Sequence, residues 1–257
     1  MITVGIDVGS ITTKAVVLRD GSILSEKITA TGYQAQAAAE TVLAGVLSEA
    51  KLKSAEVDAV VATGYGRNRV SFAGRAVTEI SCHAAGASFL SPGIRSVIDI
   101  GGQDSKVVVM DANGRVKDFA MNDKCAAGTG RFLEVMAGAL DLDLNDFGPI
   151  SLTSKAPAAI SSLCTVFAES EVISLISKGA RRQDIIAGIH AAIAARVTAM
   201  AGRIGLTAPV MMTGGVAKNI GVVKAIEARI GSPVEVSPKA QLTGAVGAAL
   251  IAARGSM

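Results

Sequence analysis

The residues of this chain that are best suited to chemistry occur in one pattern that is present twice. Residues 6–17 reappear 92 residues later as residues 98–109, with an aspartate, a glycine, a hydroxyl residue, a lysine and a β-branched run kept in register. Successive N–H groups of a tight glycine turn, a hydroxyl and a lysine suit the oxygens of a phosphate. The aspartate that ends the first apolar run suits a hydrated Mg2+. The pattern therefore predicts two phosphate-binding turns.

Each copy is predicted to fold as a strand, a polar turn and a second strand, because short Val and Ile runs flank the Gly, Ser and Thr residues. Two such hairpins predict two similar domains that face one nucleotide. Two hairpins left by a duplication, without any ligand, are the alternative. The charged and hydroxyl side chains in both turns argue against that alternative.

Candidate ligands can be assigned in both turns. Asp7 and Asp99 are predicted to hold the water shell of Mg2+. The phosphate ligands predicted in the first turn are Ser10, Thr12, Thr13 and Lys14, and those in the second are Gly102, Gln103, Asp104, Ser105 and Lys106.

The elements that must position these residues follow from hydrophobic pattern and turn signals. Strands that alternate with helices predict an α/β class. Beyond the hairpins we expect helices over 35–52, 130–140, 168–178, 183–204 and 242–254, one more that begins near Asn219, and strands over 57–63 and 209–212.

The two turns resemble the phosphate motifs of the acetate kinase, sugar kinase, heat-shock chaperone and actin superfamily. That resemblance implies two ribonuclease H-like domains with an ATP or ADP site in the cleft between them. It also implies an adenosine motif, and residues 212–219 have its form: an apolar strand runs into Gly214 and Gly215, with Lys218 following. Gln103 then becomes the residue that orients the attacking water, because phosphoryl chemistry depends on positioning.

No low-complexity linker divides the chain, and residues 91–93 form the clearest turn between its halves. We expect a first domain over 1–92 and a second over 93–241 that carries two of the cysteines. In the superfamily the C-terminal helix, here 242–257, packs back on the first domain.

Composition narrows the class of function. Half of the 257 residues are apolar, and the net charge is only +3 without a polybasic block, which disfavours a nucleic-acid partner. Charged residues are expected to interrupt each apolar run before it reaches the roughly 18 residues of a membrane span. The first residues lack the pattern of a signal peptide. We therefore expect a cytoplasmic protein.

The three cysteines are too few and too far apart for a disulfide framework. Cys125 lies in a polar, Gly-rich segment ahead of a predicted helix, and Cys164 precedes another. A helix N-terminus favours the thiolate, which is the form that binds metals. Two such thiolates are half of a 4Fe-4S site, and a symmetric homodimer would complete it. Their spacing has no local ligand signature, so inert cysteines remain an alternative.

Four segments narrow the resemblance further: residues 78–84, 99–106, 122–130 and 164–171. They resemble the activator ATPases of 2-hydroxyacyl-CoA dehydratases, in the benzoyl-CoA reductase subunit group, and the similarity runs from about residue 2 to about residue 252. The resemblance implies that Cys125 and Cys164 bind one 4Fe-4S cluster between two subunits. It gives Cys82 no ligand role.

The same resemblance implies electron transfer driven by ATP. Ferredoxin or flavodoxin would reduce the homodimer, which would then bind a 2-hydroxyacyl-CoA dehydratase or a related reductase. ATP binding and hydrolysis would change the angle between the two helices that begin near Cys125 and its dimer mate, as a hinge closure.

Other residues and functions stay open. Glu171 is expected on a solvated helix face, Glu169 is undecided between such a face and the nucleotide, and His83 and His190 are expected in ordinary core or surface roles. A small-molecule kinase of the same superfamily, similar to pantothenate kinase, would use the same turns without iron. An actin-like assembly protein would polymerise with ATP instead.

Overall fold

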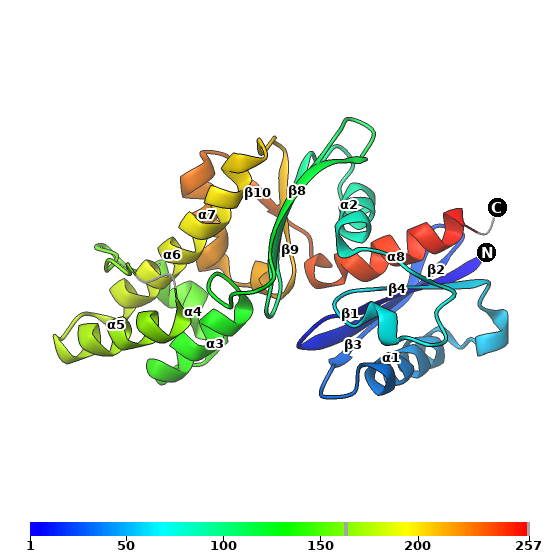
Figure 1. Ribbon diagram of the computed structural model, residues 1–257, viewed down its shortest axis with the longest axis horizontal. Helices are drawn as coiled ribbons and strands as arrows, with labels where there is room; N and C mark the ends of the chain where they lie inside the picture. Colours follow the sequence, from blue (N-terminus) through cyan, green and yellow to red (C-terminus); the bar gives the residue numbers. More distant parts are fainter. Residues whose placement is uncertain (162–163, 256–257) are drawn as a thin grey trace. The chain divides into compact units, whose positions relative to one another are not determined.

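The computed structural model describes residues 1–161 and 164–255, so the end of the C-terminal segment 242–257 and residues 162–163 lie outside the described residues. The chain forms two compact units (Figure 1). The first comprises Met1–Val97, Met110–Lys117 and the residues from Ser237 onward, and the second comprises Ile98–Val109 and Asp118–Val236. Strands and helices alternate in both, so the predicted α/β class is confirmed.

The sequence repeat is a repeat of a whole sheet. Among the described residues, each sheet has five strands, and in both the order is third, second, first, fourth, fifth along the chain. The first sheet contains β1 (Ile2–Val8), β2 (Thr12–Arg19), β3 (Ser22–Ala30), β4 (Ala59–Thr63) and β5 (Arg75–Ala76). The second contains β6 (Ser96–Ile100), β7 (Ser105–Met110), β8 (Val116–Asn122), β9 (Val210–Thr213) and β10 (Val234–Val236).

Helices cover both faces of the first sheet (Figure 1). Alternate residues of a strand point to opposite faces, so Val17 packs with α1 (Ala35–Ala50) whereas Val16 packs with α8 (Thr243–Arg254). β1 is antiparallel to β2 and parallel to β4. This pairing places Asp7 opposite Lys14.

Glycines allow α8 to lie directly against its neighbours. A Cβ atom at Gly5 in the middle of β1 would come within 2.0 Å of the carbonyl oxygen of Ala245. One at Gly247 would come within 1.8 Å of the carbonyl oxygen of Cys82, on α2 (Glu79–Leu90). The backbone of α8 therefore packs directly on the backbone of β1 and of α2. Cys82, on α2, is fully buried.

The second unit carries most of its helices between β8 and β9. They are α3 (Gly130–Ala139), α4 (Leu144–Ser151), α5 (Thr165–Ser177) and α6 (Arg182–Arg203), while α7 (Ile220–Ile230) follows β9. The short 3-10 turns of the chain are η1 (Ser54–Glu56), η2 (Arg67–Arg69), η3 (Gly215–Lys218) and η4 (Ala240–Leu242).

One helix of the described chain departs from the expected absence of a membrane span. By length and composition α6 could cross a membrane, because its 18-residue window carries few charges. However, 56% of that window is buried. It packs against α4, α5 and α7, which is how the core helix of a folded unit behaves.

Candidate functional site

The first repeated turn joins two strands around a buried ion pair. The Nζ atom of Lys14 lies 3.2 Å from Oδ2 of Asp7, and both side chains are largely buried. The N–H of Gly9 donates to the carbonyl of Thr12 at 3.1 Å and closes the turn. Ser10 and Thr12 are partly exposed there. The exposed part of this turn therefore includes two hydroxyl residues, of which Thr12 also accepts from Nε2 of Gln241 at 3.5 Å.

The second turn repeats this arrangement with one more charge. Nζ of Lys106 lies 3.2 Å from Oδ2 of Asp99 and 2.6 Å from Oδ2 of Asp104. The N–H of Gly101 donates to the carbonyl of Asp104 at 2.9 Å, and Gln103 is exposed within the turn. Two carboxylates beside one buried ammonium leave a net negative charge, which suits a hydrated Mg2+.

Two of the predicted hydroxyl ligands lie elsewhere, because the register of the second strand turns them into the unit. The Thr13 hydroxyl is fully buried, 2.9 Å from that of Thr31, which donates to the carbonyl of Gly9. The Ser105 hydroxyl is buried without a hydrogen-bond partner among the described residues. Both hydroxyls are therefore turned into the unit, and the assignment of Thr13 and Ser105 to phosphate stays a prediction.

Thr213, which sequence reasoning missed, and Gly214, which it assigned to the adenosine side, complete the second cluster. The Thr213 hydroxyl donates to Oδ1 of Asp99 at 2.8 Å. Gly214 has a φ of +85°, and a Cβ there would come within 2.9 Å of the same oxygen and 2.3 Å of the Ile100 carbonyl. Only a residue without a side chain fits this position.

The first unit shows the same feature at the end of β4. Gly64 has a φ of +91°, and a Cβ there would come within 2.5 Å of Oδ1 of Asp7. The dipeptide Thr-Gly thus ends the fourth strand of both sheets, at Thr63 and Thr213. That repeated dipeptide is the pattern from which Thr213 could have been found.

The residues predicted to bind adenosine lie at the 3-10 turn that follows β9. Gly214 leads into η3, where Gly215 and Lys218 are exposed. Asn219 then caps α7, because its Oδ1 accepts from the N–H groups of Gly221 and Val222 at 3.0 and 3.2 Å. This is the N-cap arrangement that satisfies free helix N–H groups.

A buried histidine supports this cap from behind. His190 Nε2 lies 3.3 Å from Nδ2 of Asn219, and the ring packs edge-on against Phe147. Burial lowers the pKa of His190 to about 4, so the ring is neutral near pH 7. His83 is also buried, in the first unit.

The three cysteines differ in access. Cys82 is fully buried, and burial raises the pKa of its thiol to about 12. Cys125 is partly exposed and Cys164 is exposed. Cys164 directly precedes α5, Cys125 lies shortly before α3, and these two helices are in contact.

The accessible cysteines of one chain amount to half of the ligands that a 4Fe-4S cluster takes. Within residues 1–161 and 164–255, no three His, Cys, Asp or Glu side chains gather as a complete metal site would need. Cys164 directly before α5 and Cys125 in the loop before α3 are accessible thiols, whereas a buried, protonated Cys82 is unsuited to bind iron. One chain thus offers two accessible cysteines, whereas a 4Fe-4S cluster with only cysteine ligands takes four.

Glu171 differs from the solvated side chain that the sequence predicts. Its carboxylate accepts from the N–H of Ser161 at 3.0 Å and from the Ser161 hydroxyl at 2.9 Å. The pair ties Ser161 to α5. Glu169 is partly buried on the same helix.

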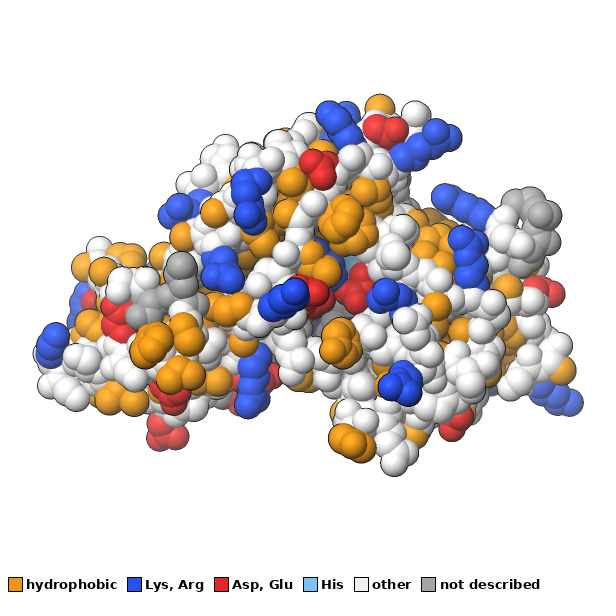
Figure 2. Space-filling model, viewed as in Figure 1, with side chains coloured by type: hydrophobic (Ala, Val, Ile, Leu, Met, Phe, Trp, Pro, Cys, Tyr) orange, Lys and Arg blue, Asp and Glu red, His pale blue; other side chains and the backbone are white. Residues whose placement is uncertain are grey.

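Apolar side chains are exposed along α5. They are Val166, Phe167, Ile173 and Ile176, with exposed fractions from 43% to 67%. Figure 2 shows hydrophobic side chains gathered over this part of the second unit. Such a patch on a folded protein marks an interaction surface.

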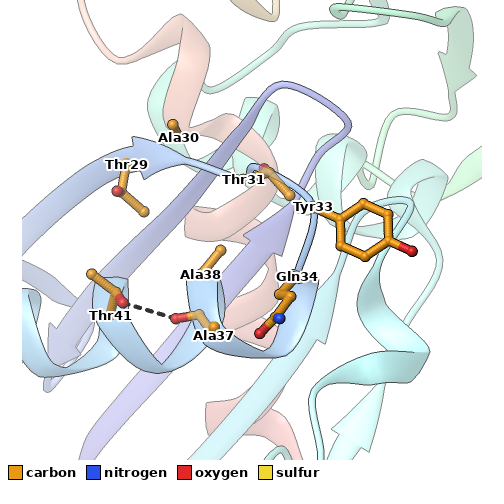
Figure 3. Close-up of a pocket in the computed structure, with 8 residues that line it drawn as sticks. All are labelled: Thr29, Ala30, Thr31, Tyr33, Gln34, Ala37, Ala38 and Thr41. Carbon is orange, nitrogen blue, oxygen red and sulfur yellow. Dashed lines mark hydrogen bonds between the residues drawn. The ribbon is translucent and has the colours of Figure 1, made fainter.

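A separate hollow of about 340 Å3 lies in the first unit, between the end of β3 and the start of α1 (Figure 3). Its walls are mainly threonine and alanine, and Tyr33 projects beside it. Of its lining, Thr31 touches the first phosphate turn, through the carbonyl of Gly9.

The chain is similar to known proteins over nearly its whole length. Residues 4–252 match the BadF/BadG/BcrA/BcrD ATPase family. The chain belongs to this family. The (R)-2-hydroxyglutaryl-CoA dehydratase activating ATPase of Acidaminococcus fermentans is 49% identical over 97% of this chain and 96% of its own length. The activator of lactoyl-CoA dehydratase from Anaerotignum propionicum is 49% identical over 98% of this chain and 97% of its own length.

Solved structures of the family have the same fold. Component A of the A. fermentans dehydratase has a TM-score of 0.96 at 48% identity, and covers 100% of this chain and 99% of its own. The Clostridium difficile activator of 2-hydroxyisocaproyl-CoA dehydratase, solved with bound ADPNP, has a TM-score of 0.93 at 46% identity over 100% of this chain and 96% of its own. A glucokinase from Streptomyces griseus, 16% identical over 99% and 100% of the two chains with a TM-score of 0.61, shares the fold alone. The family resemblance and the fold class predicted from sequence are therefore confirmed.

Proposed function

We propose that this member of the ATPase family is a one-electron activator of a 2-hydroxyacyl-CoA dehydratase or a related CoA-thioester reductase, driven by ATP hydrolysis. Relatives 46–49% identical over nearly the whole chain are named as activators of three such dehydratases. The observation that carries the proposal is the pair of accessible cysteines ahead of two packed helices, Cys164 directly before α5 and Cys125 in the loop before α3. Phosphoryl transfer by a kinase requires no such pair of cysteines.

The cysteines are proposed to hold one 4Fe-4S cluster per homodimer, two ligands coming from each chain. When bound, this cluster supplies a low-potential electron to the partner. Asn122 and Thr129 hold the loop of Cys125, and Glu171 on the helix that follows Cys164 binds Ser161. The exposed apolar residues of α5 support a dimer surface next to Cys164.

The repeated turns are proposed to serve Mg-ATP. Asp7 and Asp99 would hold Mg2+ through water, and Gln103, exposed in its turn, would orient the attacking water. Lys14 and Lys106, already paired with these aspartates, keep the carboxylates oriented. The turn residues Ser10, Thr12, Gly102, Asp104, Ser105 and Thr13 would contribute hydroxyl, carboxylate or backbone groups, and Gly214, Gly215 and Lys218 would line the adenosine side.

The electron donor is proposed to be ferredoxin or flavodoxin, in the cytoplasm. The dehydratase partner binds the acyl-CoA substrate, so the chemistry of the thioester resides on that partner. A small-molecule kinase is not favoured, because kinases resemble this chain at 16% identity in fold alone. An actin-like assembly protein would give sedimenting filaments with ATP in place of a discrete dimer.

The test is an anaerobic activation assay. The reduced protein, Mg-ATP and a 2-hydroxyacyl-CoA dehydratase are mixed, and dehydratase activity and released phosphate are followed together. We expect activity that needs ATP, fails with ADP, and is lost in Asp99→Asn but kept in the exposed control Asp118→Asn. ATP consumption that instead requires a small-molecule acceptor such as pantothenate, by a protein without iron, would contradict the proposal and favour the kinase.

A further inference from the structure

The first turn of α3 is capped by the second phosphate turn. The first N–H groups of a helix have no partner within the helix. In α3 the N–H of Gly130 donates to the carbonyl of Gly101, and that of Arg131 donates to the carbonyl of Gly102, both at 2.8 Å. The preceding residue, Thr129, makes no side-chain cap. The start of this helix is therefore fastened to the turn that is proposed to bind phosphate.

Gly130 makes this contact possible. A Cβ atom there would lie 3.2 Å from the carbonyl oxygen of Gly101 and 3.4 Å from Cα of Gly102. The shorter distance is tighter than nine in ten real Cβ contacts, so a side chain would require the turn to shift by a few tenths of an ångström. By contrast, a Cβ at Gly138, near the other end of α3, would meet nothing within 4 Å.

Hydrogen bonds also hold the segment that joins Cys125 to the start of α3. The N–H and the hydroxyl of Thr129 both donate to the carbonyl of Ala126, at 3.0 and 2.6 Å. Nδ2 of Asn122 donates to the carbonyl of Cys125 at 2.8 Å. Direct hydrogen bonds thus run from the phosphate turn to the cysteine loop, all within the second unit.

We propose that Gly130, held on the carbonyls of Gly101 and Gly102, is the positioning residue through which nucleotide at the second turn moves the loop of Cys125. The inference rests on the proposed function, because it assumes that nucleotide binds this turn. The N–H of Gly130 is already donated to the carbonyl of Gly101, so its proposed role is to position the loop. Since coupling of two sites is reciprocal, a metal held at Cys125 also changes the affinity for nucleotide at the turn.

The test uses the full-length chain without iron, so that its readout does not depend on activation. Alkylation of Cys125 and Cys164 by iodoacetamide is timed by mass spectrometry, with no nucleotide, with Mg-ADP and with Mg-ADPNP. Calorimetry gives the affinity of each nucleotide for each variant. In the wild type we expect nucleotide to change the Cys125 rate by about fivefold or more, the lower range of typical coupling.

The variants decide the role of Gly130. Gly130→Ala is expected to reduce the nucleotide effect, Gly130→Val to abolish it while nucleotide still binds, and Gly138→Ala to leave it unchanged. Where Gly130→Val does not fold, as its thermal unfolding would show, Gly130→Ala decides alone. A full nucleotide effect at Cys125 in a folded Gly130 variant would overturn the inference, and so would an equal loss in Gly138→Ala.

The failure of the inference is distinguishable from that of the proposed function. A wild type that binds nucleotide and iron and activates a dehydratase, but shows no nucleotide effect at Cys125, overturns the inference alone. A chain that binds neither nucleotide nor iron overturns the proposed function, and the inference with it.

Discussion

Lys106 shows how a single residue shapes the second turn. Its side chain is 2% exposed and lies between two carboxylates, those of Asp99 and Asp104. A buried charge is tolerated only when it is paired, because transfer from water costs several kcal/mol. Lys106 therefore stabilises the folded turn through these two ion pairs, without any bound phosphate.

We predict that Lys106→Met lowers the free energy of unfolding by about 3 kcal/mol, because it leaves Asp99 buried without a counter-charge. Urea denaturation measures the loss. Lys218→Met, at an exposed lysine, should change stability by less than about 0.5 kcal/mol. Adding Asp99→Asn to Lys106→Met should recover part of the loss, and a double variant with no recovery would contradict the pairing.

The cysteines should separate by their reactivity. Cys82 is buried with a pKa of about 12, so it carries almost no thiolate at pH 8, whereas Cys125 and Cys164 are accessible. In the folded, iron-free chain we predict that iodoacetamide labels Cys125 and Cys164 and leaves Cys82 unlabelled. In urea all three should react. Labelling of folded Cys82 as fast as Cys164 would show that its enclosure is wrong.

His190 should make stability depend on pH. Its pKa is about 4 in the folded chain and about 6.5 when unfolded, so acid protonates the unfolded state first. The stabilisation from a neutral His190 is complete above pH 6.5 and is lost as pH falls towards 4. Between pH 7.5 and pH 5 we predict a loss of roughly 2 kcal/mol.

The control for this prediction is His190→Gln, which cannot titrate. Its unfolding free energy, measured by urea denaturation at the same pH values, should fall less between pH 7.5 and pH 5 than that of the wild type. Equal slopes for the two proteins would refute the role of His190.

At the scale of elements, the closeness of α8 to the first sheet depends on Gly5. A Cβ there would lie 2.0 Å from the carbonyl oxygen of Ala245, and backbone cannot yield as a flexible side chain does. We predict that Gly5→Ala destabilises the chain by about 3 kcal/mol through overpacking. Gly202→Ala in α6, where a Cβ meets nothing within 4 Å, should be neutral or stabilising. Thermal unfolding of both variants measures the difference, and an unaffected Gly5→Ala would contradict this packing.

Which elements could be predicted from sequence depended on their burial. Central strands such as β1 and β6 are buried on both faces and read as Val and Ile runs. The edge strands β3 and β8 are largely exposed, so they lack such runs and escaped prediction. β9 begins at Val210, one residue later than predicted, because Pro209 has no N–H for the ladder. α5 begins at Thr165, three residues before its predicted start.

Site residues divide in a similar way. Asp7, Lys14, Asp99 and Lys106 could be found because the repeat keeps them in register, and the structure pairs them. The burial of the Thr13 and Ser105 hydroxyls depends on which face of a strand each occupies, which the pattern of a short turn does not specify. Thr213 reaches Asp99 across 114 positions of sequence, so only the fold brings them together.

At the scale of the whole molecule, duplication explains the design. Both units use the same strand order, place an aspartate and a lysine around the first turn, and end the fourth strand with Thr-Gly. The second unit adds the long insertion between β8 and β9 that carries both accessible cysteines. Both units therefore share the strand order and the turn proposed for nucleotide. The second unit alone carries the two cysteines proposed for electron transfer.

The measurement that tests this account most directly is iron and acid-labile sulfide in the protein purified without oxygen, together with its visible spectrum and its mass in solution. The account predicts roughly four irons per pair of chains. It also predicts loss of this iron in Cys125→Ser and in Cys164→Ser, and retention in Cys82→Ser. A colourless protein that binds ATP but takes up no iron on reconstitution, or one that keeps its iron without Cys125 or Cys164, would contradict it.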